Sequence, residues 1–266
     1  MAFNIVCPSS RGLSLALSRQ LLLKTSLPLV ATARTDLAGV KARILENLPQ
    51  PVPEERVTVL RVDVTDEPTL SSAATQIRSL FPRQNAKYIF STAGVLHPER
   101  SPQQLSTANI THTLHTNVLG PLLVLKHFSQ FLPRQEGERG EGEGGGGEEE
   151  GINIWANVSA RLGSISDNRR GGWYSYRASK AAVNSITKTF DLHLQQQKCG
   201  DGAMCVALHP GTVKTQLSRE FWGSVEKEGK LFKPEFAAER LLDVVMRLKK
   251  EDRGCCWDWK GERIEW

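Results

Sequence analysis

The stretch Phe3-Asn-Ile-Val-Cys7-Pro-Ser-Ser-Arg-Gly12-Leu-Ser14 lies close to the start of the chain and decides its fold class. A short apolar run leads into a turn that contains serines, an arginine and a glycine, and a helical pattern begins near Leu13. A strand, a turn and a helix N-terminus together form a site for an anion, because the first N–H groups and the helix dipole face the turn. Gly12 is the only glycine, so the Gly-x-Gly-x-x-Gly fingerprint is missing, and an ordinary polar turn is the competing interpretation.

The same alternation of apolar runs and helical segments continues along the chain. Strands are predicted where runs rich in Val, Ile and Ala occur, at 3–7, 28–33, 57–62, 87–90, 152–158 and 203–208. Helices are expected at 12–24, 36–47, 67–81, 102–132, 173–197 and 234–250. Strands that read as continuous apolar runs are typical of a parallel sheet covered on both faces. The sequence therefore predicts an α/β protein: one doubly wound Rossmann-type domain over residues 1–266.

The composition narrows the class of protein. With 266 residues and 39% hydrophobic content, the chain can bury a substantial core. No run of about eighteen apolar residues occurs, so we expect no membrane span. The odd number of cysteines, without metal-ligand spacing, favours a reducing compartment, and we predict a cytoplasmic protein. Residues 1–35 contain arginine and serine but no acid, which leaves a mitochondrial transit peptide as the alternative.

The net charge of +5 conceals one acidic tract. Residues 136–151 contain seven Glu, eight Gly and one Arg, so this tract carries −6 and the rest of the chain +11. Such a tract cannot bury apolar surface, and we expect a disordered loop between a helix and the next strand. The basic excess is spread along the chain without a nucleic-acid-binding pattern, so we expect no nucleic acid as a partner, while an anionic cofactor fits.

Tyr176 and Lys180 share one face of the helix predicted at 173–197, because residues i and i+4 are neighbours on a helix. A tyrosine has a pKa near ~10, and a charge at ~4 Å in a medium of effective dielectric ~20 supplies about the 4 kcal/mol that bring it toward neutrality. The pair can therefore act as a general acid or base on a carbonyl or an alcohol. A tyrosine that merely packs under a lysine stem is the competing interpretation.

Arg34 follows the second predicted strand, at the position where dinucleotide-binding folds choose between cofactors. An acidic residue there would hold a ribose 2′-hydroxyl, whereas an arginine suits a 2′-phosphate. Together with Arg11, Arg34 predicts NADP(H) rather than NAD(H). Asp36 is the rival residue, and we interpret it as the N-cap of the next helix.

In this order and spacing, the motifs resemble those of the short-chain dehydrogenase/reductase superfamily, and more narrowly its C-factor-like (CsgA/sniffer-type) branch of carbonyl reductases. The resemblance extends from the Ser-Ser-Arg-Gly12 turn to the final Trp257-Asp-Trp-Lys-Gly261 stretch. It implies a catalytic set that consists of Asn117, Ser159, Tyr176 and Lys180. It also implies cofactor contacts from Ser10, Arg11, Leu13, Arg34, Asp63, Val64, Ala93, Gly94, Asn117, Tyr176, Lys180, Pro210, Gly211, Val213 and Thr215.

The chain departs from the family pattern at three positions. Pro8 and Ser14 replace the outer glycines of the first turn. The third departure concerns the family's Ser-Ser-x-x-Gly motif, which reads Ser159-Ala160-Arg-Leu-Gly163 here, so that Ala160 stands where relatives carry the serine that holds the substrate carbonyl. Ser159, Ser164 or no serine at all are the alternatives for that role.

The resemblance implies an NADPH-dependent reductase of a small-molecule carbonyl, reversibly an alcohol dehydrogenase. Hydride would reach the carbonyl while Tyr176 donates the proton, with Lys180 as its assistant and Asn117 in a water relay. The alternative, motivated by Ala160 and Pro8, is a catalytically weak or inactive nucleotide-binding or interaction protein that keeps the fold. The family also implies a homodimer or homotetramer.

The surroundings of the expected site are less specific. We expect residues 214–233 to form a mobile lid, and an aromatic wall at the mouth of the site from Trp173, Tyr174, Phe221 and Trp222. Trp257 and Trp259 are expected in the core or in a subunit contact. The six histidines show no metal-ligand spacing, and we predict no metal site.

Overall fold

The computed structural model describes residues 2–133, 151–197, 202–227 and 229–266. Within these residues, eight strands form one sheet in the order β10-β9-β6-β5-β4-β1-β2-β3. Strands β1 to β6 and β9 run parallel, and only β10 is antiparallel to its neighbour. The strands of this sheet are β1 Phe3–Cys7, β2 Leu29–Ala33, β3 Val57–Arg61, β4 Ala86–Ser91, β5 Asn153–Val158, β6 Ala203–His209, β9 Cys256–Asp258 and β10 Arg263–Ile264.

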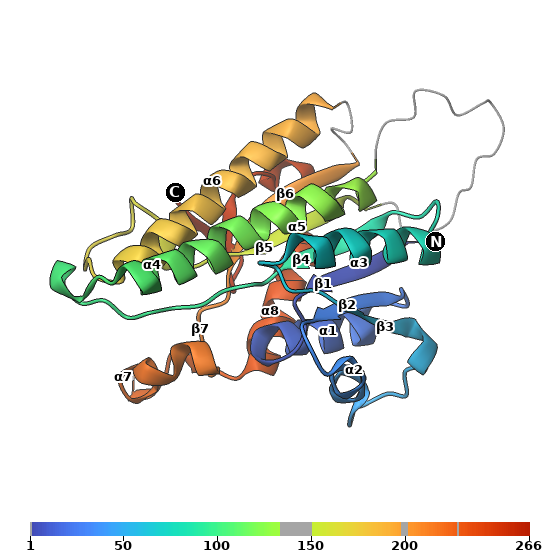
Figure 1. The fold of residues 1–266 in the computed structure, drawn as a ribbon, viewed down its shortest axis with the longest axis horizontal. Helices are drawn as coiled ribbons and strands as arrows, with labels where there is room; N and C mark the ends of the chain where they lie inside the picture. Colours follow the sequence, from blue (N-terminus) through green and yellow to red (C-terminus); the bar gives the residue numbers. More distant parts are fainter. Residues whose placement is uncertain (1, 134–150, 198–201, 228) are drawn as a thin grey trace.

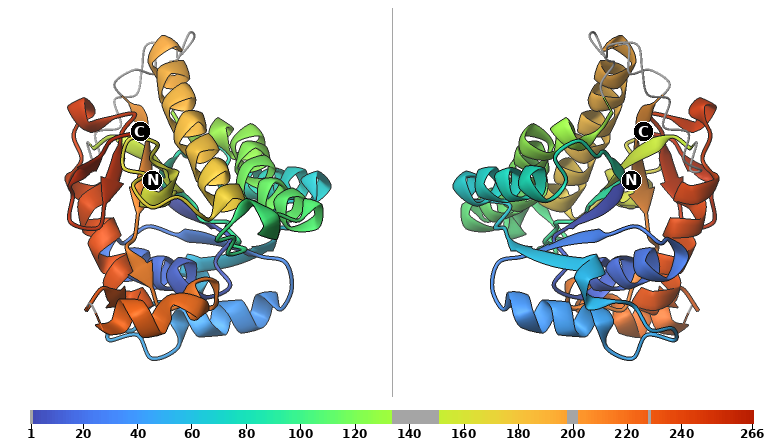
Figure 2. Two further views of the ribbon diagram at one scale, coloured as in Figure 1. Left: turned by 90° about the vertical axis from the view of Figure 1, so that its left-hand side faces the viewer. Right: turned by 90° about the vertical axis from the view of Figure 1, so that its right-hand side faces the viewer.

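Helices cover both faces of the sheet (Figure 1). Helices α1, α2 and α8 pack on one face, while α3, α5 and α6 pack on the other, so that the molecule has three layers (Figure 2). The α-helices are α1 Gly12–Lys24, α2 Leu37–Leu45, α3 Glu67–Leu80, α4 Thr107–Leu114, α5 Gly120–Phe128, α6 Tyr174–Gln196, α7 Trp222–Lys227 and α8 Pro234–Arg247. The predicted doubly wound Rossmann-type fold is therefore confirmed.

The sequence prediction of the strands is accurate. All six predicted strands are present, and each end differs by at most one residue. The hairpin of β9 and β10 was not predicted, because three and two residues are too short to show a period. A second, two-stranded sheet pairs β7 (Thr212–Val213) with β8 (Leu231–Phe232), and it brackets the segment that we expected to form a lid.

The segment predicted as one helix at 102–132 is helical from Thr107 to Phe128, with a π-helical turn in its middle and short 3₁₀ turns on either side. The segment contains a 3₁₀ turn η2 (Pro102–Gln104), α4, a π-helical turn η3 (His115–Leu119), α5 and a 3₁₀ turn η4 (Ser129–Phe131). Pro121 explains the interruption, since it has no N–H to offer the carbonyl four residues before it. That carbonyl belongs to Asn117, so the irregular turn falls at a predicted functional residue, as π-turns often do.

Two buried hydrophobic clusters fill the spaces between the sheet and the two layers of helices. The cluster under α3, α5 and α6 contains the large side chains of Phe3, Phe128 and Trp155, whereas the cluster under α1, α2 and α8 is mainly aliphatic. The parallel strands have their carboxyl ends at one edge of the sheet. The strand order reverses between β1 and β4, and folds of this kind bind ligands at such a point. Of the predicted disordered loop at 136–151, all but Gly151 lies outside the described residues.

Candidate active site

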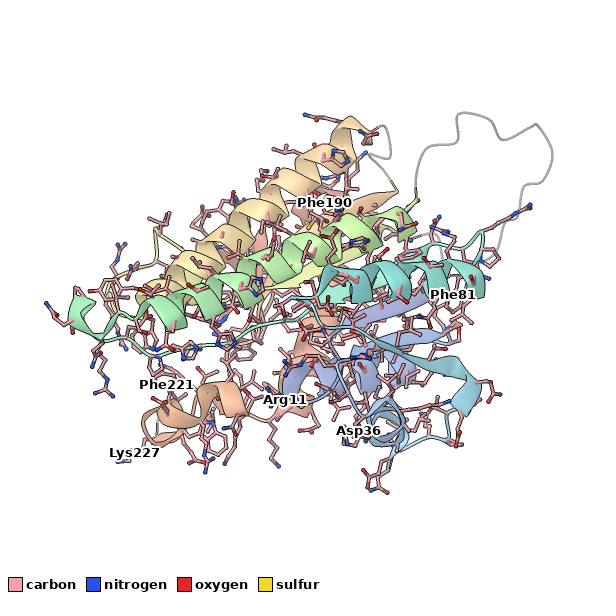
Figure 3. The ribbon with its side chains drawn as sticks, viewed as in Figure 1. Arg11, Asp36, Phe81, Phe190, Phe221 and Lys227 are labelled. Atoms are coloured by element: carbon pink, nitrogen blue, oxygen red, sulfur yellow. The ribbon has the colours of Figure 1, made fainter. Side chains whose placement is uncertain are left out.

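The N-terminus of α1 lies at the carboxyl end of β1, as predicted. Gly12 begins the helix with a left-handed φ of 57°, and the N-cap residue Arg11 makes no side-chain cap, so the first helical N–H groups are available to an anion. A Cβ on Gly12 would stand 3.0 Å from Cγ2 of Thr215. The structure therefore brings together the first turn and the segment after β6, two predicted parts of one cofactor site. Figure 3 shows Arg11 at this end of α1.

Arg34 and Asp63 meet at the ends of β2 and β3. The Nη1 atom of Arg34 lies 3.9 Å from Oδ2 of Asp63, and the Arg34 side chain is 70% exposed. Although burial alone would raise it, hydrogen bonds from Thr65 and the Arg34 charge hold the pKa of Asp63 below its usual range. Asp36 caps α2 by accepting from the Gly39 N–H, which confirms its interpretation as an N-cap. The Asp36 carboxylate also pairs with Arg43 at 3.1 Å, so it is engaged within its own helix.

Tyr176 and Lys180 both lie in the buried face of α6. They are 6% and 3% exposed, and Nζ of Lys180 lies 5.7 Å from the centre of the Tyr176 ring. The ammonium donates to the Val158 carbonyl at 2.8 Å, at the carboxyl end of β5. Gly94 faces the same ammonium, since a Cβ on Gly94 would stand 3.6 Å from Nζ and 3.9 Å from Oδ1 of Asn117. Four predicted site residues thus converge on one spot.

Burial governs the protonation of this pair. It raises the pKa of the Tyr176 hydroxyl and lowers the pKa of Lys180 to about 8. We expected Lys180 to bring the tyrosine pKa toward neutrality, but burial shifts that pKa in the opposite direction in the structure. The phenol therefore keeps its proton at neutral pH, as a proton donor must, and the lysine is still mostly charged.

Asn117 occupies the π-helical turn and is fully buried. Its Oδ1 accepts from the Val95 N–H at 2.8 Å, and its Nδ2 donates to the Val95 carbonyl at 2.9 Å and to Oγ of Ser179 at 3.0 Å. Ser179 in turn donates to the Tyr176 carbonyl at 2.8 Å. The side chain of Asn117 therefore ties the loop after β4 to α6.

The hydroxyl of Ser159, which we expected to hold the substrate carbonyl, has internal partners in the structure. Ser159 is 2% exposed, and its hydroxyl donates to Oδ1 of Asn184 at 2.6 Å, with the Lys180 carbonyl at 3.4 Å as a second internal acceptor. A serine has one proton to donate, and here it is directed to Asn184. Ser164 is equally buried and accepts from the Asp167 N–H at 3.0 Å. Strand alternation explains the result, because Ser159 follows β5 on the face that packs against α6.

The segment after β6 is held by aromatic side chains. Gly211 has a φ of 73°, and a Cβ there would stand 2.6 Å from the Phe232 ring. The ring of Phe232 contacts that of Trp259 with centroids 4.6 Å apart, so Trp259 belongs to the core support of this segment. Pro210 precedes the turn, and Val213 pairs with Phe232 in the small sheet.

The expected lid consists of η6 (Gln216–Phe221) and α7, and it faces the N-terminal end of α6 (Figures 1 and 3). The rings of Trp173 and Phe221 lie 5.8 Å apart in an edge-on arrangement. This contact joins the segment before α6 to the segment after β6. Two of the four predicted aromatic residues therefore meet, whereas Tyr174 is 40% exposed.

The remaining predicted cofactor residues line the same edge of the sheet. Val64 lies under the start of α5, where a Cβ on Gly120 would stand 3.0 Å from it. Ser10 and Leu13 are half-buried beside Arg11, and Ala93 is buried next to Gly94. Sequence reasoning missed Glu99, a buried carboxylate in the loop after β4, because no period or motif marks a single acid in a loop.

None of the helices among the described residues is long and apolar enough to cross a membrane. The same residues contain no group of three His, Cys, Asp or Glu side chains that could hold a metal ion.

Comparison with known proteins identifies relatives of the chain, although no family model matches it. The chain is 30% identical over 205 residues to the 1-hydroxy-2-glutathionyl-2-methyl-3-butene dehydrogenase of Rhodococcus sp. (strain AD45), a match that covers 77% of this chain and 78% of that protein. It is 30% identical over 159 residues to the C-signal protein of Myxococcus xanthus, which covers 60% of this chain and 80% of that protein.

A solved structure agrees with these relatives. The NADPH-bound carbonyl reductase from chicken fatty liver superposes with a TM-score of 0.79 at 25% identity, over 100% of this chain and 99% of that one. The relatives and the fold confirm the resemblance that the motifs indicated. The chain belongs to the short-chain dehydrogenase/reductase superfamily of oxidoreductases, in the branch that includes the C-signal protein.

Proposed function

We propose that this chain is an NADPH-dependent reductase of small-molecule carbonyl compounds, reversibly an alcohol dehydrogenase, and that one domain carries the whole activity. The observation that supports it best is the convergence of Tyr176, Lys180, Asn117 and Gly94 at the carboxyl edge of the sheet. Carbonyl reduction needs a protein group that can donate a proton and a positive charge beside it. It also needs space for the cofactor to approach the backbone closely, which Gly94 provides.

The residues present fit a dinucleotide. The uncapped first turn of α1, with the amides near Ser10, Arg11 and Leu13, suits a pyrophosphate, and Gly12 allows close approach. Asp63, Val64, Ala93 and Gly94 would border the adenosine and nicotinamide portions from the ends of β3 and β4. Pro210, Gly211, Val213 and Thr215 would close the nicotinamide side. When bound, NADPH supplies the hydride.

The chain's own residues handle the proton. Tyr176 holds its proton at neutral pH and donates it to the developing alkoxide, because that oxygen becomes far more basic than the carbonyl was. Lys180 supplies positive charge next to the phenol and stabilises the phenolate that remains. Asn117 joins the loop after β4 to α6 through its side chain. The family resemblance implies that a water held at its π-helical turn would return a proton to the site.

The test is NADPH oxidation with a panel of aldehydes, ketones and quinones. We expect turnover by the wild type and a loss of at least about 100-fold in kcat for Tyr176→Phe, since general acid catalysis contributes about that much. Tyr174→Phe is the matched control, because it removes the hydroxyl of a 40% exposed tyrosine at the first residue of α6. Equal rates for the wild type and Tyr176→Phe would end the role of Tyr176 as acid.

Preference for NADPH over NADH is proposed from Arg34, whose exposed guanidinium lies at the end of β2, and the chicken reductase binds the same cofactor. A hydrogen-bonded guanidinium-phosphate pair contributes about 1.5–3 kcal/mol, so Arg34→Ala should weaken NADPH binding by about 10-fold or more and leave NADH unchanged. Titration of both cofactors measures the ratio. An unchanged ratio would refute the 2′-phosphate assignment.

A second candidate is a nucleotide-binding protein with little or no catalysis. The observation that favours it is the engagement of the Ser159 hydroxyl with Asn184, together with Ala160 at the family's serine position. NADPH binding without turnover across the whole panel would support this candidate. Turnover that depends on Tyr176 would exclude it.

We also propose a cytoplasmic homodimer or homotetramer. The four described cysteines are free thiols, which suits a reducing compartment. Three leucines on consecutive turns of α4, η3 and α5 are 37% to 42% exposed, which suits burial against a second copy: Leu114, Leu119 and Leu122. Light scattering on the purified protein and cell fractionation test the two statements, and a monomer at micromolar concentration would refute the first.

A further inference from the structure

Glu99 lies in the loop between β4 and α4, and its carboxylate is buried against the first turn of α6. The residue is 2% exposed. Its Oε2 accepts from the Ser175 N–H at 2.8 Å, and its Oε1 accepts from the Ser175 hydroxyl at 2.7 Å. Its own backbone carbonyl accepts from the Trp173 N–H at 2.6 Å. We propose that Glu99 is a positioning residue that fixes the first turn of α6 and so places Tyr176 for proton transfer, an inference that rests on the function proposed above.

Helix α6 needs an external partner at its start. Its N-cap residue, Trp173, has a left-handed φ of 50° and makes no side-chain cap. Gly171 and Gly172 before it have φ values of 62° and 67°, so three consecutive residues are left-handed. That conformation is unfavourable for a bulky residue and persists only where the surroundings enforce it. Glu99 supplies that enforcement, because it binds the backbone on both sides of Tyr174.

The charge of Glu99 suits this place. The first N–H groups of a helix lack intrahelical partners and carry the positive end of the helix dipole. A carboxylate that accepts both donors of Ser175 forms two charge-assisted hydrogen bonds, which are the stronger kind. The usual N-cap side chain belongs to the helix itself, whereas Glu99 lies 76 residues earlier in the sequence.

Tyr176 therefore has fixed neighbours on both sides. Ser175 is held by Glu99, and Arg177 donates to the Gly172 carbonyl at 3.0 Å and to the Leu162 carbonyl at 3.3 Å. Side chains at the start of a helix take their direction from the backbone of that turn, so the phenol follows whatever moves the turn.

The loop that carries Glu99 is anchored at its other end. The Asn117 side chain binds both backbone groups of Val95, and the Arg100 N–H donates to Gln104 at 2.6 Å. Because the loop is anchored, a cap that it provides can hold the first turn of α6 in place. A cap on an unanchored loop would move together with the helix. Asn117 and Glu99 thus hold α6 from the same loop.

The experiment compares Glu99→Gln, Ser175→Ala and the double variant with the wild type. The assays are kcat, KM for NADPH, and amide hydrogen exchange of residues 173–180. Glu99→Gln keeps the shape but turns an amide N–H₂ toward the Ser175 donors. We expect kcat to fall by about 10-fold to 100-fold, an unchanged KM for NADPH, and faster exchange in 173–180. Ser175→Ala removes the hydroxyl bond to Glu99 and leaves the N–H bond, so its effect should be the smaller one. The double variant should be no slower than Glu99→Gln, because the bond that Ser175→Ala removes ends on Glu99.

Asp252→Asn is the control, since Asp252 also caps a turn by accepting from the Lys249 N–H at 2.8 Å, in the 3₁₀ turn Lys250–Asp252 that follows α8. It should change neither kcat nor exchange in 173–180. An unchanged kcat for Glu99→Gln, or slower turnover without faster exchange, would overturn the proposal. If the wild type shows no turnover at all, the proposed function fails, and unchanged exchange in Glu99→Gln then refutes the holding role by itself.

Discussion

Replacement of Gly163 by alanine should displace the backbone of α6 at Lys180 and so disturb the candidate active site. Gly163 ends the turn η5 (Arg161–Gly163), which packs against α6 at Lys180. A Cβ on Gly163 would stand 2.7 Å from the Lys180 carbonyl carbon and 2.8 Å from its oxygen, whereas ordinary contact begins at 3.4 Å, so the two elements must separate by about 0.7 Å. Both contacting atoms are backbone, so no side-chain rotation relieves the overlap.

Two measurements follow from that displacement. Overpacking of this kind costs about 1–3 kcal/mol, so the free energy of unfolding in urea should fall by that amount with an unchanged m-value. A misplacement approaching 1 Å costs up to about 100-fold in rate, so kcat should fall at least about 10-fold with the preferred carbonyl substrate.

Gly223→Ala is the matched control. A Cβ on Gly223 meets nothing within 4 Å, and its backbone lies in α7 without positive φ. This variant should keep kcat and change the stability by less than about 1 kcal/mol. The reasoning is refuted if Gly163→Ala behaves like Gly223→Ala in both assays.

Two further predictions concern neighbouring positions. Burial lowers the pKa of His209 to about 4, with the Arg161 charge as a second cause, and its Nδ1 has no partner. The unfolded chain therefore binds more protons than the folded chain between pH 4 and ~6.5, and the free energy of unfolding should fall by up to about 3 kcal/mol as pH drops through that window. Urea titrations should show a smaller fall for His209→Gln than for the exposed control His193→Gln; equal falls would contradict this assignment. Ala160→Ser introduces the hydroxyl that the family resemblance implies for this position, and kcat should rise about 10-fold or more if the carbonyl lies there; an unchanged or lower kcat would exclude that placement.

The sequence predicted the fold because its strands are uniform. Each buried parallel strand reads as an apolar run, and that pattern depends on local residues alone. The helix predicted at 102–132 is present from Thr107 to Phe128, but its π-helical turn was not predicted, because a periodic pattern does not register the missing N–H of Pro121. The β9–β10 hairpin depends on pairing with β6, a contact between distant parts of the chain.

The candidate site divides in the same way. Tyr176 and Lys180 could be proposed as site residues from their helical spacing, and Arg34 from its position directly after a strand. The direction of the Ser159 hydroxyl depends on Asn184, which lies 25 residues away, and the role of Glu99 depends on a helix still farther along the chain. Such partners become visible only when the chain is folded.

The two outer strands of the large sheet bear on how the protein avoids unwanted association. One border is β10, a strand of two residues that includes the exposed Arg263, and the other is β3, which ends in the exposed Arg61. Short strands and charged residues make poor templates for the addition of another chain, and sheets with such borders resist growth into fibrils. Crowding and heat should therefore lead this protein to associate through its helical surfaces before its strands.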